Sequence, residues 1–299
     1  MRWEFNYLSQ PMNVSKLNKS TRKYPNGRAV KGGLRSRQII GKYKIGKLLA
    51  NGGFGRVYSA TDTIEGIQVA LKIPFDEYVD DEMLDLFRQE VRLVAQLDHP
   101  GILPVKNADF IDDRFVIVTR LGLETLESRM TRRMSVLKVL DYIEQMIGAV
   151  SCAHDSNILH CDIKPENFIL FEGDVIRLTD FGIAKVSKMT IAGSGTGTVG
   201  HMAPEQAMGR PNKRSDVFSL GLIMYRMLAG QWPEYPFDWP PPGAINLRRK
   251  RIHPDLINLI RKAISARPKD RFVDVVQMEE LYEEVYETAV RNLKRRPRR

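Results

Sequence analysis

The sequence predicts an α+β fold of two unequal lobes: a small antiparallel sheet with one helix, followed by a larger helical lobe. The first observation is a change of period, because strand-like apolar runs follow residue 43 and helical spacing dominates after Leu121. The second is their order, since strands followed by helices argue against alternating βαβ units. The third is composition: 299 residues, 43% of them hydrophobic, exclude a chain that is disordered throughout.

The elements are expected in the following order. Strands are predicted at Tyr43–Leu49, Arg56–Thr61, Gln68–Ile73, Ile102–Val105 and Phe115–Thr119. A helix is predicted over Asp80–Leu97, where apolar residues recur at helical spacing until His99-Pro100-Gly101 ends it. Later helices are predicted at Val136–His154, Arg214–Ala229, Pro254–Ala266 and Val273–Ala289.

The net charge of +10 belongs to the two ends of the chain. Residues 1–44 hold eleven Lys or Arg and one acid, and residues 291–299 hold six and none, so the segment between them is mildly acidic. We therefore expect a basic flexible arm at 1–42, a folded domain at 43–289 with lobes 43–119 and 120–289, and a basic tail at 290–299. The tails are either solvated disorder or a docking site for an anionic partner, nucleic acid or an acidic protein.

Targeting and redox signals are missing from the sequence. No stretch approaches 18 uncharged apolar residues, so no membrane span is expected, and the N-terminus lacks a secretory signal. Cys152 and Cys161 form neither a disulfide framework nor a metal-ligand spacing. A cytoplasmic protein is the expectation.

Two early features are weak signals when taken alone. The glycine-rich turn over residues 50–55 could bring backbone N–H groups close to a phosphate, but hairpin turns are commonly rich in glycine. It is neither a Walker A loop nor a good dinucleotide fingerprint. Lys72 ends the apolar run Val69–Lys72, where it is either an edge-strand lysine with its head in water or a charge that needs a partner. Glu90 is the candidate partner.

The strongest signal lies in the middle of the chain. The segment His160–Asn167 places Asp162, Lys164 and Asn167 close together, and Asp180 follows within a hydrophobic run. Carboxylate and carboxamide oxygens suit Mg²⁺, and an ammonium group suits phosphate.

These motifs resemble, in order and spacing, the eukaryotic-type protein kinase family across about residues 43–287. The resemblance implies a two-lobed kinase fold that uses ATP with Mg²⁺, for which Mn²⁺ could substitute. It implies that Lys72 holds the α- and β-phosphates and pairs with Glu90, that Asp162 accepts the hydroxyl proton, and that Lys164 neutralises the γ-phosphate. Asn167 and Asp180 would hold the metal.

The resemblance also assigns the rest of the nucleotide site. The loop residues would be Ala50, Asn51, Gly52, Gly53, Phe54 and Gly55. Val57, Ala70 and Ile169 would sandwich the adenine, Val118 would be the gatekeeper, and Thr119–Leu121 would form the hinge. His160, Phe181 and Val94 resemble the spine that aligns the lobes.

Further residues resemble particular branches of the family. Lys164-Pro165-Glu166 resembles the serine/threonine branch, and Thr198 would brace Asp162. Glu205 of the Ala-Pro-Glu motif would pair with Arg271, which favours protein substrates, and Ala203-Pro204-Glu205-Gln206 resembles bacterial members.

Three positions depart from the family pattern: Ala50 replaces a glycine, His201 stands where tyrosine is common, and Cys161 replaces an arginine. Cys161 is either a redox switch or a small packed side chain. The expected activity is that of a serine/threonine protein kinase with autophosphorylation. The alternatives are a kinase-fold scaffold and a nucleic-acid-associated protein whose role depends on its basic tails.

Overall fold

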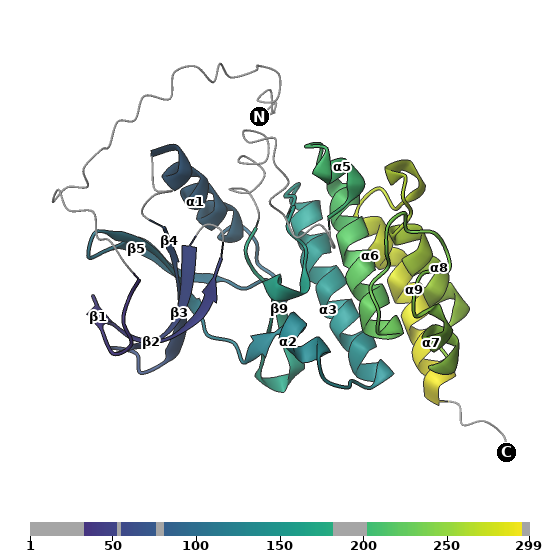
Figure 1. Cartoon of the computed structure of the whole chain (residues 1–299), viewed down its shortest axis with the longest axis horizontal. Coiled ribbons are helices and arrows are strands. Elements are labelled where there is room, and N and C mark those ends of the chain that lie inside the picture. Colours follow the sequence, from purple (N-terminus) through teal and green to yellow (C-terminus); the bar gives the residue numbers. More distant parts are fainter. Residues whose placement is uncertain (1–32, 53–54, 76–80, 182–201, 295–299) are drawn as a thin grey trace.

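The chain folds into two lobes, which lie side by side in Figure 1. The computed structural model describes residues 33–52, 55–75, 81–181 and 202–294. A six-stranded antiparallel sheet with one helix forms the first lobe, and helices form most of the second. This arrangement confirms the predicted α+β fold class.

The sheet of the first lobe has the strand order β1-β2-β3-β4-β6-β5. Its strands are β1 Ile39–Ile40, β2 Tyr43–Asn51, β3 Gly55–Asp62, β4 Gln68–Pro74, β5 Val105–Ile111 and β6 Arg114–Arg120. Helix α1, Asp81–Val94, packs against β5 and lies above the sheet in Figure 1. In the central strands Lys72 of β4 is aligned with Ile117 of β6, so these two residues share a face.

The two faces of this sheet bury different sets of side chains. On one face Leu71 and Val118 pack with apolar residues of β1, β2 and β3. On the other face Ile117 packs with Leu84 and Phe87 of α1. Because side chains alternate along a strand, neighbours in sequence serve different cores.

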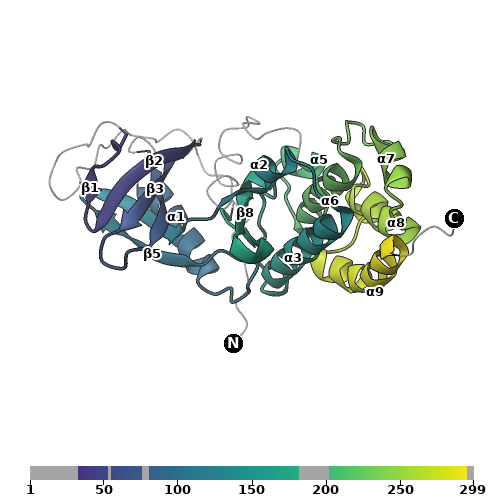
Figure 2. The same cartoon turned by 90° about the horizontal axis from the view of Figure 1, so that it is seen from below.

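The second lobe is organised around α6, which is buried along nearly its whole length. Its helices are α2 Leu126–Met130, α3 Val136–Asp155, α5 Pro204–Ala207, α6 Lys213–Ala229, α7 Ala244–Arg249, α8 Pro254–Ala263 and α9 Val275–Lys294. Helices α3, α8 and α9 pack against α6, and Figure 2 shows this cluster at the C-terminal side. None of the described helices is long and apolar enough to cross a membrane.

A small sheet and three short 3-10 helices complete this lobe. The sheet has the order β7-β8-β9, with β7 Glu124–Thr125, β8 Phe168–Phe171 and β9 Val175–Leu178. The 3-10 helices are η3 Pro165–Asn167, η4 Glu172–Asp174 and η5 Pro268–Asp270. Strand β8 directly follows η3, so the segment that carries Asp162, Lys164 and Asn167 leads into this small sheet.

Some predicted boundaries are wrong. Ordered chain precedes residue 43, because β1 pairs with β2 and Ile40 is buried, and α9 runs past residue 289 to Lys294. Ile102 does not begin a strand but makes one parallel bridge to Leu178, and the strand begins at Val105. Residues 1–32 and 295–299, to which most of the tail predictions apply, lie outside the described residues.

A buried ion pair ties α5 to the segment between α8 and α9. Arg271 donates to both carboxylate oxygens of Glu205, at 2.7 and 3.2 Å, as the sequence predicted. It also donates to the carbonyl oxygens of Arg214, Ser265 and Ala266, and its side chain is fully buried. The guanidinium group therefore connects three chain segments through hydrogen bonds.

Truncation of Arg271 should lower the stability of the helical lobe. We expect Arg271→Ala to lower the free energy of unfolding by about 3–5 kcal/mol, because it leaves a largely buried carboxylate unpaired. Arg267→Ala, which removes an exposed pair with Asp270, is the matched control and should cost less than about 1 kcal/mol. Urea unfolding measures both variants, and equal losses would contradict the assigned role.

Candidate functional site

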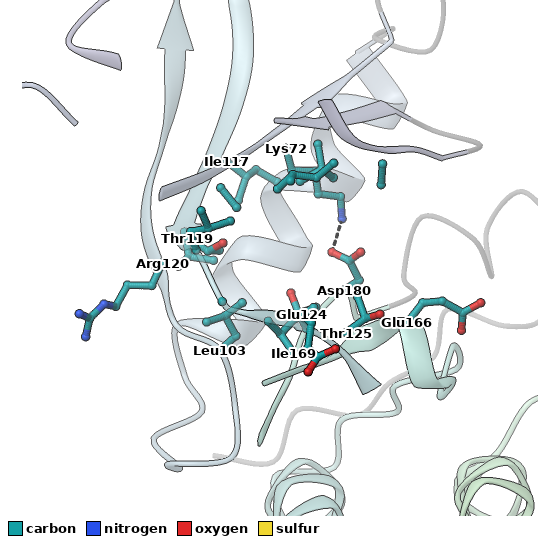
Figure 3. Close-up of a pocket in the computed structure, with 18 of the residues that line it drawn as sticks. Lys72, Leu103, Ile117, Thr119, Arg120, Glu124, Thr125, Glu166, Ile169 and Asp180 are labelled. Carbon is teal, nitrogen blue, oxygen red and sulfur yellow. Dashed lines mark hydrogen bonds and ion pairs between the residues drawn. The ribbon is translucent and has the colours of Figure 1, made fainter. Parts of the chain in front are cut away.

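A cavity of about 410 Å³ lies between the lobes (Figure 3). Its apolar walls come from both lobes, with Val57 and Ala70 on the sheet and Ile169 on β8. Its polar groups include Lys72 and Asp180. Apolar walls with a few convergent charges are typical of a site for a small organic ligand.

Lys72 is held between two carboxylates. Its Nζ donates to Glu90 Oε1 at 3.1 Å and to Asp180 Oδ1 at 2.8 Å, and the second contact is the dashed line in Figure 3. Burial alone would lower the pKa of Lys72, but the charges of Asp180 and then Glu90 outweigh it and raise that pKa. The lysine is therefore charged, and its predicted pairing with Glu90 is present.

A second polar group surrounds Asp162. Asn167 Nδ2 donates to the backbone oxygen of Asp162 and to its Oδ2, both at 2.8 Å. Lys164 Nζ lies 3.2 Å from the same Oδ2. The two bonds from Asn167 span the loop, so they fix the direction of the Asp162 carboxylate.

This loop is anchored from below by buried Asp216 on α6. The backbone N–H groups of His160 and Cys161 donate to its carboxylate at 2.8 and 2.9 Å, and His154 Nε2 lies 3.1 Å from it. Burial alone would raise the pKa of Asp216, but hydrogen bonds and charge from His154, with help from His160, hold it below its ordinary value. Cys161 adopts a positive φ of 60°, which lets successive N–H groups reach one carboxylate.

His160 links the loop to the residue after Asp180. Its ring packs on Phe181 with the centroids 4.7 Å apart, and its Nε2 donates to the carbonyl oxygen of Thr179 at 3.0 Å. Burial lowers the pKa of His160, so the ring is neutral. Val94, Phe181 and His160 are all buried, in keeping with the predicted spine.

The gatekeeper assignment to Val118 is wrong. Val118 is fully buried on the opposite face of the sheet and does not line the cavity. Ala70 and Lys72 face the cavity, and their antiparallel partners Thr119 and Ile117 share that face. Thr119 therefore faces the cavity near the end of β6, and Arg120 and Leu121 after it also line the cavity.

The glycine-rich turn is only partly described. Gly52 N–H donates to Gly55 O at 2.9 Å, while Gly53 and Phe54 lie outside the described residues. A Cβ on Gly55 would lie 2.4 Å from the carbonyl oxygen of Ile73, so strand packing alone requires glycine at this position. Ala50 lines the cavity, whereas Asn51, Gly52 and Gly55 are not among the residues that line it.

Several residues of the site escaped the sequence analysis. They are Leu49, Val91, Leu103, Val105, Glu124, Ser128, Glu166 and Thr179, all of which line the cavity. Gly122 is another, since a Cβ there would lie 2.2 Å from Ile169 Cγ2. Most lie within strands or helices but outside any recognised motif, and only Leu103, Gly122 and Thr179 come from connections. Periodicity can indicate which face of an element a residue occupies, but not that this face lines a cavity.

The donor set fits a hard divalent cation. Asn167 uses its amide nitrogen for both bonds to Asp162, which leaves its amide oxygen for a ligand, and Asp180 lies in the cavity with its side chain 39% exposed. Oxygen ligands of this kind suit Mg²⁺. Thr198, predicted to brace Asp162, and His201 lie outside the described residues.

Comparison with known proteins gives consistent matches. The family model described as protein kinase domain matches residues 43–286. The chain is 33% identical over 264 residues to the serine/threonine-protein kinase PrkC of Bacillus subtilis, covering 81% of this chain and 40% of PrkC. It is 33% identical over 248 residues to PknA of Mycobacterium tuberculosis, covering 76% of this chain and 56% of PknA.

The solved structures agree. The PknI kinase domain of Mycobacterium tuberculosis superposes with a TM-score of 0.64 at 25% identity, covering 85% of this chain and 99% of that one. The apo form of PpkA-294 superposes with a TM-score of 0.70 at 22% identity, covering 84% and 99%, and supports the fold. The chain spans about half the length of the curated relatives named above.

Cysteine substitution tests whether the side chain at position 119 faces the cavity. We expect the thiol of Thr119→Cys to react with a methanethiosulfonate reagent at least about tenfold faster than that of Val118→Cys, because only the first side chain faces the cavity. Mass spectrometry of the labelled peptides separates these thiols from Cys152 and Cys161. Faster labelling at position 118 would restore the original gatekeeper assignment.

Proposed function

The chain belongs to the protein kinase domain family, and from this premise we propose that it transfers the γ-phosphate of ATP to serine or threonine hydroxyls of proteins. One observation supports this above all others. Lys72 and Asp180 form an ion pair in the cavity, and Glu166, from the loop that holds Asp162, lines the same cavity. Such a site places phosphate-binding charge beside a proton acceptor.

The nucleotide would occupy the cavity between the lobes. The adenine fits between Val57 and Ala70 above and Ile169 below, since apolar walls favour a flat ring. Lys72 would hold the phosphates, and Glu90 keeps its ammonium group in place. Glu124 and Ser128, which also line the cavity, offer polar groups for the sugar.

Transfer would then depend on positioning and charge. Asp162 would orient the acceptor hydroxyl and take its proton, and Lys164 would stabilise negative charge on the phosphoryl group. Asn167 and Asp180 would hold Mg²⁺, with Mn²⁺ as a substitute, and this cation supplies neutralisation of phosphate charge when bound. The bonds from Asn167 keep the Asp162 carboxylate pointed toward the reacting group.

Serine and threonine are the proposed acceptors. The segment Lys164-Pro165-Glu166 resembles the serine/threonine branch of the family. We expect a site near Asp162 that admits a short hydroxyl and that the longer phenol of tyrosine would overreach. PrkC and PknA are both named as serine/threonine-protein kinases, which supports this choice. A kinase-fold scaffold would be favoured by loss of Lys72, Asp162, Asn167 or Asp180, and all four are present.

The roles of the tails stay predictions. Docking of nucleic acid or an acidic protein to residues 1–42 or 290–299 concerns segments that lie mostly outside the described residues. A cytoplasmic location is likewise a proposal.

Two carboxylate variants test the proposed roles. Asp162→Asn should lower the rate of phosphate transfer by about a hundredfold or more, because it removes the proton acceptor. ATP affinity should change little in that variant. Asp180→Asn should instead lose the Mg²⁺ dependence of ATP binding. Transfer from [γ-³²P]ATP and calorimetric titration with an ATP analogue measure the two properties, and phosphoamino-acid analysis identifies the acceptor.

The control is Asp112→Asn, the same chemical change at an exposed turn of the first lobe. It should transfer phosphate at the wild-type rate. Normal transfer by Asp162→Asn would refute the assigned proton acceptor, and phosphotyrosine as the main product would refute the substrate class.

Cys161 leads to a prediction about regulation. In the family the arginine at this position pairs with a phosphate on the activation loop, but burial and the charges of Asp216 and Asp162 raise the pKa of the Cys161 thiol. The thiol is neutral and offers the phosphate no cation. We therefore expect phosphatase treatment, or joint replacement of Ser187, Thr190, Ser194 and Thr196 by Ala, to change the initial rate less than about tenfold. A larger drop would mean that another cation has this role.

A further inference from the structure

A second cavity lies in the helical lobe, between the connection from α2 to α3 and the end of α6. We call it the basic groove. Its volume is about 600 Å³, and four cations line it: Arg132, Arg133, Arg226 and Lys250. Met130 and Met134 are among its apolar lining, and no acidic residue lines it.

Positive charge in this groove is largely uncompensated within the part of the chain that the structure describes. Arg132 pairs with Glu124, but no described carboxylate forms an ion pair with Arg133, Arg226 or Lys250. Burial, followed by repulsion from Arg133 and Arg226, lowers the pKa of Lys250. Three cations that repel one another without a carboxylate among them form a site for anionic groups.

Helix capping explains only half of the cluster. Arg226 donates to Gly230 O at 2.6 Å and Lys250 donates to Leu228 O at 2.7 Å, so both compensate the C-terminal end of α6. Each of these side chains has further N–H donors. Arg132 and Arg133 make no described hydrogen bond to α6. Capping therefore leaves the pair of arginines from the α2–α3 connection unexplained.

The groove lies close to the proposed catalytic loop. Helix α2 separates them: Ser128 of α2 lines the nucleotide cavity, Met130 lines the groove, and α2 packs on η3, which follows Lys164. The five residues of α2 span about 7 Å. An extended peptide advances about 3.3 Å per residue, so a few residues are enough to pass from one site to the other.

Building on the proposed function, we infer that the basic groove binds acidic side chains of the protein substrate a few residues from the phosphorylated serine or threonine. Guanidinium groups match carboxylates in geometry and charge, and the methionines accommodate the apolar parts of the same segment. The groove is thus a specificity determinant for acidic substrate sequences, and it stands apart from the reacting atoms.

Peptide binding without ATP tests this inference independently of catalysis. The probes are fluorescein-labelled peptides with one serine and with Asp or Ala at the third to sixth residues on either side. For the peptide with Asp on one of the two sides of the serine, the wild-type chain should show about tenfold tighter binding than for the matched Ala peptide. Fluorescence anisotropy measures both affinities, and this ratio is expected for a few partly exposed ion pairs at low salt. Arg133→Glu should abolish this difference, and Arg133→Lys should retain most of it.

Arg249→Glu is the matched control, because it makes the same charge change at an exposed residue of α7 outside the groove. It should keep the preference for Asp. Equal affinity of the wild-type chain for Asp and Ala peptides would overturn the inference, and so would a preference that survives in Arg133→Glu or is lost equally in Arg249→Glu. Competition by inorganic phosphate without any peptide preference would likewise overturn it.

If phosphate transfer is active, kcat/KM for the Asp and Ala peptides should show the same ratio. Binding preference without transfer would contradict the proposed function and leave the groove intact as an acidic-peptide site. Phosphate transfer without a preference for the Asp peptide would support the proposed function and overturn the inference about the groove.

Discussion

The geometry of the loop His160–Asn167 depends on one buried carboxylate. Asp216 lies in the centre of the helical lobe, where an unpaired charge would be costly, and the backbone N–H groups of His160 and Cys161 satisfy it. His154 of α3 contacts Asp216 of α6 through Nε2, and its Nδ1 accepts the N–H of Val275 in α9 at 3.0 Å. These contacts therefore connect α3, α6 and α9 at one buried site. The rigid helical core thus sets the position of a loop that has little regular structure of its own.

The cleft has its own electrostatic constraint. Lys72 comes from the sheet, Glu90 from α1 and Asp180 from the second lobe. Both ion pairs of Lys72 can form only when the sheet, α1 and the second lobe are correctly placed relative to one another. Moving α1 or rotating the lobes would separate one of these pairs and leave a poorly solvated charge. The ion pairs of Lys72 therefore couple the arrangement of the two lobes to the geometry of the charged groups in the cavity.

The sequence was sufficient for the polar residues of the site and insufficient for its shape. Asp162, Asn167 and Asp180 stand out because charged and strongly polar groups beside apolar runs have few structural explanations. The facing of Val118 could not be predicted, because β6 is apolar on both faces and its period is hidden. Strand β5 was misplaced for the opposite reason, since Val105–Ile111 holds three polar or charged residues with no clear alternation. The basic groove combines three distant segments, and no local pattern announces it.

The small side chain of Thr119 in the proposed nucleotide cavity has a consequence for inhibitor design. A threonine there leaves room that a larger residue would fill, and its hydroxyl presents a hydrogen-bonding group on an otherwise apolar wall. An inhibitor that extends a bulky group past Thr119 toward Ile117 would gain contacts that ATP does not need. Selectivity over kinases with a longer side chain at this position would then follow from steric exclusion rather than from stronger attraction.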